Sequence, residues 1–404
     1  MSGPSQVGLN EHGSLTFRPL GAYVASQYPE YQDGLPYLLK VLSIRTALSI
    51  QAHPDATLAK ELHRNFPELY RDPNHKPELA IALTPMDAMS SFRSIPEIVH
   101  FLKNVPELVN VIGVEPAQHF IETAASFLVP TEHPYDLASP LRQSLQNMFK
   151  SLMTADADVV NRELDSLLRR LPSTLHGADD RWSYLVEMIQ TIAKSYPGDV
   201  GVFSAFLLNV LRLQPGEAIF LAQNEPHAYL HGDCVECMAT SDNVVRAGLT
   251  PKFKDVETLV RMLTYKCGSP VIYKGLPPSL LQQQQESTAS TSSSSASSSL
   301  LEPSQHRPIL KDSKHQRLVY APPVEEFIID RYCLHPNDSV SIDCDRPAIL
   351  LCTEGSGGVL QDGQAFGMGS AFFVPPLSSV SLHNHGDSDL VLFRSMVPHE
   401  APHA

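Results

Sequence analysis

The sequence predicts a mainly β protein with two barrel domains and one α-helical domain inserted into the first barrel. Short apolar strands separated by turn residues fill residues 1–90, continue in residues 200–275 and return in residues 310–404. Residues 91–199 instead repeat their apolar side chains at helical spacing. Residues 279–305 are a Gln and Ser tract, which predicts a low-complexity linker or loop.

Composition narrows the class of protein. A length of 404 residues and a hydrophobic content of 43% are typical of a globular protein with two or three domains. The formal charge of −14 argues against a nucleic-acid partner, which would need a basic surface. An anionic ligand would therefore need a local cluster of Lys and Arg against the overall field.

The cysteines and the N-terminus suggest a compartment. Six Cys are too few for a disulfide framework in a chain of this length, which favours a reducing compartment. The first five residues lack the basic and apolar regions of a signal peptide, and no run of about 18 apolar residues could span a bilayer. We expect a cytoplasmic monomer with no membrane partner.

The first candidate site follows two strands. Residues 1–34 are expected to form loop and weak strand, and residues 35–42 an apolar strand. In the next strand Ser49, Gln51 and His53 would share one face. An amide oxygen and an imidazole two residues apart can supply half of a metal site. The alternative is a strand end whose His is simply hydrogen-bonded.

A second polar group enters the next strand. Asp55 is the expected N-cap of a short amphipathic helix. Residues 70–83 then read as a proline-bounded extended segment that becomes a buried strand. His75, Lys76 and Glu78 would project into a cleft if this interpretation holds. The alternative is a solvated turn.

The helical region shows core positions and no chemistry. Its apolar stripes predict four to six helices. The stripes comprise Ile98, Phe101, Leu102 and Val105; Leu141, Leu145, Met148, Phe149 and Leu152; Val160, Leu164, Leu167, Leu168 and Leu171; and Leu185, Met188, Ile189 and Ile192.

The residue pattern again predicts strands from about Ser204, with a Pro-Gly turn at residues 215–216. Polar and apolar residues then interleave as in a small barrel, and His227 and Tyr229 would share one face of a strand.

Two further patterns resemble metal-ligand pairs. Cys234 and Cys237 have zinc-ribbon spacing, but no second such pair exists and both lie in strand-like sequence, so structural thiols are the favoured interpretation. In the C-terminal barrel or sandwich, His383 and His385 have no carboxylate near them in sequence. We therefore interpret them as surface residues.

Four blocks together carry a family resemblance. They are LSIQAHPD at residues 48–55, NHKPE at 74–78, PHAYL at 226–230, and a fourth block that runs from GDCVEC at 232–237 through SDNVVRAGLTPK at 241–252. In this order they resemble the type I phosphomannose isomerases of the cupin superfamily, and the resemblance covers nearly the whole chain. It implies that both barrels are cupin-like jelly rolls.

The resemblance also implies a metal site and a reaction. The family's zinc ligands match Gln51, His53, Glu78 and His227, which would hold one Zn²⁺ per chain. The implied reaction is the interconversion of mannose 6-phosphate and fructose 6-phosphate through an enediol, which would feed GDP-mannose synthesis. Arg246 matches the family's active-site arginine and would stabilise negative charge.

Roles in proton transfer and sugar binding are hypotheses on this basis. Lys76 and Asp242 are the candidates for proton transfer, because burial and like charge beside a zinc ion would favour the neutral, basic form of the lysine. The candidates for contact with the sugar phosphate are Ser49, Lys40, His75, Tyr229 and Lys252.

The chain also departs from the family pattern. Two segments with which members usually begin, Tyr-x-Trp-Gly and Glu-Leu-Trp-x-Gly-x-His-Pro, are absent from this sequence. We therefore expect open strand edges, an exposed apolar face and reduced stability. The alternative function is a cupin-like protein that binds metal and sugar phosphate with impaired turnover.

Overall fold

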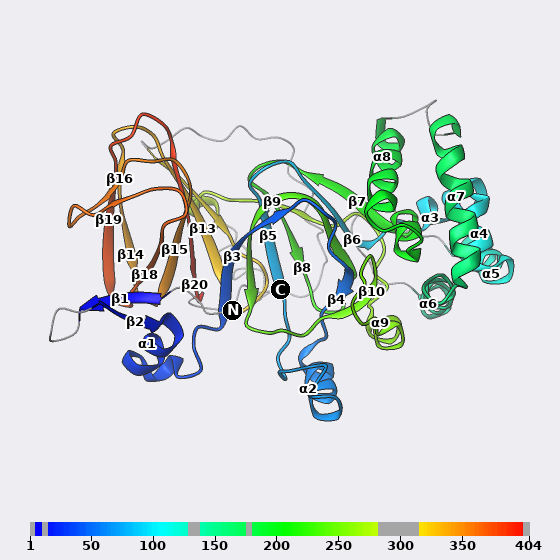
Figure 1. The fold of residues 1–404 in the computed structure, drawn as a ribbon, viewed down its shortest axis with the longest axis horizontal. Coiled ribbons are helices and arrows are strands. Elements are labelled where there is room, and N and C mark those ends of the chain that lie inside the picture. The colour runs from blue at the N-terminus through cyan, green and yellow to red at the C-terminus, as the bar shows by residue number, and fades with distance from the viewer. Residues whose placement is uncertain (1–4, 10–14, 128–137, 175–179, 282–314, 399–404) are drawn as a thin grey trace, which may run out of the picture. The chain divides into compact units, whose positions relative to one another are not determined.

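A computed structural model describes residues 5–9, 15–127, 138–174, 180–281 and 315–398 (Figure 1). The chain divides into two compact units. One contains residues 40–273, and the other combines residues 1–39 with residues 274–404. Most of the predicted linker lies outside the described residues.

The unit of residues 40–273 is built on one large antiparallel sheet in the order β10-β4-β9-β5-β8-β11, to which β3, β6 and β7 are attached. Its strands are β3 (Tyr37–Ile44), β4 (Ile50–Ala52), β5 (Glu78–Ala82), β6 (Met86–Phe92), β7 (Leu208–Leu213), β8 (Glu217–Leu221), β9 (His227–Ala239), β10 (Val245–Gly248) and β11 (Ile272–Lys274).

The long strand β9 is strongly bent. His227 at its start pairs with Gln51 of β4, whereas Met238 near its end pairs with Glu78 of β5. In a straight strand His227 and Met238 would lie roughly 36 Å apart. The imidazole of His227 is nevertheless 3.7 Å from the carboxylate of Glu78. The sheet must therefore be curved, so that both ends of β9 lie next to the space between His227 and Glu78.

Alternation along the strands decides which side chains face that space. Ile50 and Ala52 of β4 and Ala228 of β9 belong to the core shared with the helices. The intervening residues Gln51 and His227 must point to the opposite face of the sheet. The apolar positions thus orient the polar ones.

A group of helices is inserted between β6 and β7. It contains α3 (Ile95–Asn104), α4 (Pro106–Ile112), α5 (Val114–Ala125), α6 (Ser139–Met153), α7 (Ala157–Thr174) and α8 (Asp180–Ser195). The predicted apolar stripes are buried, apart from the partly buried Leu168. Around Ser204, where strand was expected, the chain forms a 3₁₀ helix (Val200–Phe206) before β7.

Two further helices flank the sheet. Helix α2 (Ala56–Asn65) begins where predicted, because Asp55 accepts hydrogen bonds from the N–H groups of Thr57 and Leu58, each at 2.9 Å. Helix α9 (Val256–Met262) is capped in the same way by Asp255, which accepts from Thr258 N–H at 3.0 Å.

The other unit is also built on antiparallel sheets. One contains β12 (His315–Tyr320), β13 (Ile328–Leu334), β20 (Leu390–Met396), β15 (Ala348–Glu354) and β18 (Ala371–Val374). The second contains β14 (Ser339–Cys344), β19 (Ser378–Asn384), β16 (Gly358–Leu360) and β17 (Ala365–Phe366). The inner faces of both sheets supply one hydrophobic cluster.

The N-terminal segment differs from its prediction. Strands β1 (Ser5–Leu9) and β2 (Leu15–Pro19) form a hairpin, and α1 (Leu20–Gln27) follows where loop and weak strand were expected. Helix α1 has little amphipathic patterning and buries Val24 alone among its residues, so the helical period is hard to see in the sequence. None of the helices that the structure describes could cross a membrane.

Candidate metal centre

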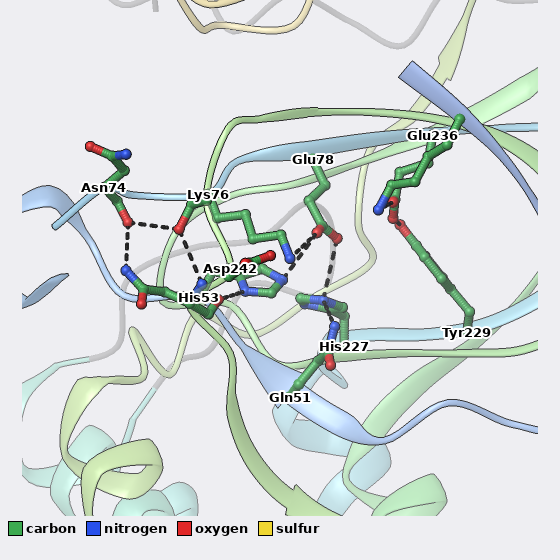
Figure 2. Close-up of polar contacts among 12 residues, drawn as sticks. Gln51, His53, Asn74, Lys76, Glu78, His227, Tyr229, Glu236 and Asp242 are labelled. Atoms are coloured by element: carbon green, nitrogen blue, oxygen red, sulfur yellow. Dashed lines mark hydrogen bonds and ion pairs between the residues drawn. The ribbon is translucent and has the colours of Figure 1, made fainter. Parts of the chain in front are cut away.

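Three buried side chains from separate strands meet inside the curled sheet. His53 directly follows β4, while Glu78 and His227 are the first residues of β5 and β9. The Nε2 atom of His53 is 3.3 Å from Glu78 Oε1, and Nε2 of His227 is 3.7 Å from Glu78 Oε2. Figure 2 shows both imidazoles turned toward the Glu78 carboxylate.

The hydrogen bonds of the two imidazoles define their tautomers. Nδ1 of His53 lies 2.7 Å from the carbonyl oxygen of Asn243, and Nδ1 of His227 lies 3.1 Å from that of Glu225. A carbonyl oxygen can only accept, so each Nδ1 carries the proton. Both Nε2 lone pairs therefore point at the space beside Glu78.

This space has the chemistry of a cation site. Nε2 of His53 and Oε2 of Glu78 are completely buried and have no hydrogen-bond partner. Such orphaned polar atoms are costly unless a ligand satisfies them. The donor atoms of His53, Glu78 and His227 all lie within 4.8 Å of one another. Tetrahedral zinc with N and O ligands places donors about 3.3 Å apart, so the set fits such an ion.

The charges of the site favour deprotonated ligands. Burial alone would raise the pKa of Glu78, but positive charge beside it, on His53 when that ring is protonated and then on Lys76 and His227, outweighs burial and holds this pKa below its ordinary range. Burial, together with repulsion from a protonated His53, lowers the pKa of His227 to about 4. A carboxylate and a neutral imidazole are the forms that bind metal.

Gln51 lies beside the three candidate ligands His53, Glu78 and His227, on the same face of the sheet as His227. Its Nε2 is 3.3 Å from His227 Nε2, and its Oε1 accepts a hydrogen bond of 3.1 Å from the hydroxyl of Ser49. An amide turned over by 180° exchanges its oxygen and nitrogen at nearly the same positions. In that orientation Oε1 faces the ligands and the Ser49 hydroxyl accepts from the amide.

The residues predicted to take part in catalysis differ in how deeply they are buried. Lys76 is buried, and its ammonium is 3.6 Å from Glu78 Oε1. Arg246 pairs with Gln51 across β10 and β4, so it shares the face of the ligands, and burial lowers the pKa of its guanidinium. Asp242 is exposed on the loop between β9 and β10.

A second polar cluster, partly exposed at Lys40, lies next to the candidate ligands. Glu236 of β9 forms an ion pair of 2.6 Å with Lys40 and accepts a hydrogen bond of 3.0 Å from the hydroxyl of Tyr229. Burial and repulsion from Glu78 raise the pKa of Glu236. Burial would lower the pKa of Lys40, but Glu236 outweighs it and the pKa rises. Figure 2 shows Tyr229 and Glu236 as a group beside the ligands.

Glu236 is the residue of this site that our sequence interpretation missed. Its signal was a carboxylate between Cys234 and Cys237, within the apolar second half of β9, a position where a charge needs a partner. Lys40, one candidate for sugar contact, is that partner.

The remaining predicted residues lie further out. His75 points away from Lys76, as expected for adjacent residues in extended chain, and its Nδ1 is 3.4 Å from the side-chain oxygen of Gln223. Lys252 is exposed beyond β10.

The other patterns contribute nothing to this centre. Cys234 and Cys237 are buried, unpaired, and three residues apart on β9, so they face opposite sides of the sheet. One further group with metal-ligand spacing occurs among the described residues, Cys333, His335 and Asp389. Unlike the centre, it is largely exposed at His335 and Asp389, whose side chains are 59% and 44% exposed.

Family models and similar proteins all point to one protein family. The model of the type I phosphomannose isomerase catalytic domain matches residues 6–95, and that of the family's helical insertion domain matches residues 111–208. The chain is 39% identical over 402 residues to the mannose-6-phosphate isomerase of Macaca fascicularis, covering 98% of this chain and 84% of that one. It is 38% identical to mannose-6-phosphate isomerase 2 of Arabidopsis thaliana, covering 90% and 72% of the two chains.

Solved structures agree over most of the chain. A point mutant of phosphomannose isomerase from Salmonella typhimurium superposes with a TM-score of 0.68 at 27% identity, covering 96% of this chain and 89% of that one. A zinc-bound mannose 6-phosphate isomerase superposes with a TM-score of 0.65 at 26% identity over the same shares. With its antiparallel sheets, its helical insertion and its buried His-Glu-His centre, this chain belongs to the type I phosphomannose isomerase family.

Proposed function

We propose that this protein is a zinc-dependent aldose-ketose isomerase that interconverts mannose 6-phosphate and fructose 6-phosphate. The observation that carries the proposal is the pair of orphaned buried atoms, His53 Nε2 and Glu78 Oε2, inside a centre of zinc-binding size. The names of the relatives and the zinc bound to a structural neighbour support the substrate and the metal.

Gln51, His53, Glu78 and His227 would hold one zinc ion. When bound, the ion supplies a Lewis acid that polarises a sugar oxygen. The isomerisation moves one proton from C2 to C1 and one from the C2 hydroxyl to the oxygen on C1, and the carbon-bound proton requires a group that first accepts and then returns it. Lys76, in its neutral amine form, is the better candidate for that group, since its Nζ is buried beside the centre whereas Asp242 is exposed.

The remaining roles follow from charge and position. Arg246 projects from the ligand face and would stabilise negative charge on the enediolate or phosphate. Lys40 and Tyr229, both bonded to Glu236, would contact the sugar from the other side of the centre. Ser49, His75 and Lys252 remain proposals as outer contacts to the sugar phosphate.

The proposed organisation follows the family. Residues 1–90 and 200–275 would form the catalytic cupin-like jelly roll, with residues 91–199 as its helical insertion. Residues 310–404 would form a second cupin-like barrel after the linker at residues 279–305. Six buried free cysteines support a reducing, cytoplasmic location. A monomeric state without nucleic-acid or membrane partners remains a prediction.

A coupled assay tests the proposed function. The purified chain is expected to carry one zinc by elemental analysis and to form fructose 6-phosphate from mannose 6-phosphate. His227→Ala should abolish both, because it removes a buried candidate ligand, while His383→Ala in the other unit should change neither. Stoichiometric zinc without turnover would replace this proposal by the alternative of a metal- and sugar-phosphate-binding protein.

A further inference from the structure

We propose that Asp72 is a positioning residue that holds the imidazole of His53 in its metal-binding orientation. The proposal rests on the proposed function, since it assigns Asp72 a role toward the zinc ligands. Asp72 lies in the extended segment before β5 and contacts none of the ligands directly in the structure described here. Its carboxylate instead binds the loop of residues 240–244, whose backbone holds His53.

The carboxylate of Asp72 makes hydrogen bonds to this loop at three consecutive residues. It accepts from the hydroxyl of Ser241 at 2.8 Å, from the N–H of Asp242 at 2.7 Å and from the side-chain amide of Asn243 at 3.2 Å. It also accepts from the N–H of Asn74 at 3.0 Å, within its own segment. One half-buried carboxylate therefore fixes two segments about 170 residues apart.

We call the hydrogen bonds of the Asp72 carboxylate to residues 241–243 the Asp72 clamp. Asn243 connects this clamp to the metal centre. Its side-chain amide also donates to the carbonyl oxygens of Asp72 at 2.7 Å and Asn74 at 2.9 Å. Its own carbonyl oxygen accepts the Nδ1 proton of His53 at 2.7 Å. Asn243 is 1% exposed, so water cannot take over this bond. Figure 2 shows Asn74 on the side of His53 that faces away from Glu78.

His53 and His227 differ in how far along the chain the carbonyl acceptor of Nδ1 lies. His227 bonds the carbonyl of Glu225, only two residues away on the same segment, so its orientation is set locally. The acceptor for His53 lies 190 residues further along the chain. His53 therefore depends on a tertiary clamp that His227 does not need. A partner that fixes the tautomer of a ligating histidine typically changes metal affinity by about 10- to 100-fold.

The same clamp acts on the segment that leads into β5. Asp72 precedes Lys76 and Glu78 by four and six residues, and its bonds to Ser241 and Asn243 tie the start of that segment down. Loss of the carboxylate should therefore disturb His53 first and the entry of β5 second.

The test compares Asp72→Ala with the wild-type full chain in two measurements. Zinc release to an excess of chelator should accelerate by about 10- to 100-fold. In the metal-free chain, imidazole ¹⁵N spectra should show that His53 loses its pure Nδ1–H tautomer while His227 keeps it. Asp156→Ala, which removes a carboxylate bonded to the N–H groups of residues 158 and 159 in the helical insertion, is the matched control and should change neither.

Unchanged zinc release together with an unchanged His53 tautomer would overturn the proposal. If Asp72→Ala does not fold, Ser241→Ala removes one bond to the same carboxylate, and zinc release should accelerate severalfold; no acceleration would equally overturn the proposal. A wild-type chain that binds no zinc would refute the proposed function instead, and the tautomer measurement would still decide the role of Asp72.

Discussion

At the scale of single residues, each histidine of the centre uses its two ring nitrogens for different tasks. Nδ1 donates to a backbone carbonyl, and Nε2 faces Glu78. The sequence could identify the imidazoles, because Gln51 and His53 alternate with apolar residues on a strand. It could not identify the carbonyl acceptors, since any residue type carries one.

The pKa of His227 predicts a pH-dependent stability. In the metal-free chain this pKa is about 4, against about 6.5 in the unfolded chain. Between these values the unfolded state binds a proton that the native state does not, so stability falls as pH falls, by about 1.4 kcal/mol per unit. Urea unfolding at pH 6.5 and pH 5 should show wild type losing about 1.6 kcal/mol more than His227→Gln, because the unfolded imidazole is already half protonated at pH 6.5.

Equal losses in both chains would contradict this prediction. It would mean that His227 is protonated in the native metal-free protein, and therefore that the burial of its ring does not control its charge.

Lys76 gives the residue-scale prediction on catalysis. Lys76→Ala should lower kcat by roughly 10²- to 10⁴-fold, as expected for loss of a positioned acid/base group, while zinc content stays at one per chain. The matched control is Lys60→Ala on the exposed face of α2, which should leave kcat unchanged. Turnover at the wild-type level in Lys76→Ala would leave the proton-transfer step to another group.

At the scale of elements, the bend in β9 brings the ligands together. Gly232 lies in β9 with φ of +108°, two residues beyond Leu230, where the pairing of β9 with β6 shifts register. An added Cβ would meet the backbone oxygen of Pro85 at 2.7 Å. Sequence patterning found the strands before and after this point, but the bend depends on a backbone contact between β9 and the turn before β6, which no local pattern contains.

Gly232→Ala should therefore destabilise the chain by about 1–3 kcal/mol and weaken zinc binding. Gly363→Ala is the matched control, because φ is also positive, at +87°, but nothing lies within 4 Å of the added Cβ. Chemical denaturation and chelator competition measure the two effects. If both variants behave alike, the backbone conformation alone matters and the close approach at Gly232 does not.

At the scale of the unit formed by residues 40–273, one core joins the helical insertion to the sheet. Phe149 of α6 lies 5.3 Å from Phe92 of β6, ring centre to ring centre, and both are fully buried. The apolar stripes predicted α3, α6, α7 and α8 because a 3.6-residue period is a local property, whereas no stripe was identified for α4 and α5. The helix α1 was missed for the converse reason, since its residues show little such period.

Phe149→Ala should lower the free energy of unfolding by about 3–5 kcal/mol. The shared core also predicts that the insertion and the metal centre unfold together. The fluorescence of Trp182, the one tryptophan in the chain, reports on the insertion, where its ring stacks on His100. Zinc release reports on the sheet. Two separate denaturation transitions would show that the insertion folds independently.

Zinc K-edge X-ray absorption of the holoenzyme tests the central claim most directly, because it reports the atoms bound to the metal. The centre of Gln51, His53, Glu78 and His227 predicts only nitrogen and oxygen ligands at about 2.0–2.2 Å, with the outer-shell scattering of two imidazoles. A sulfur ligand at about 2.3 Å would contradict the account, because it would place the zinc on cysteine rather than inside the curled sheet.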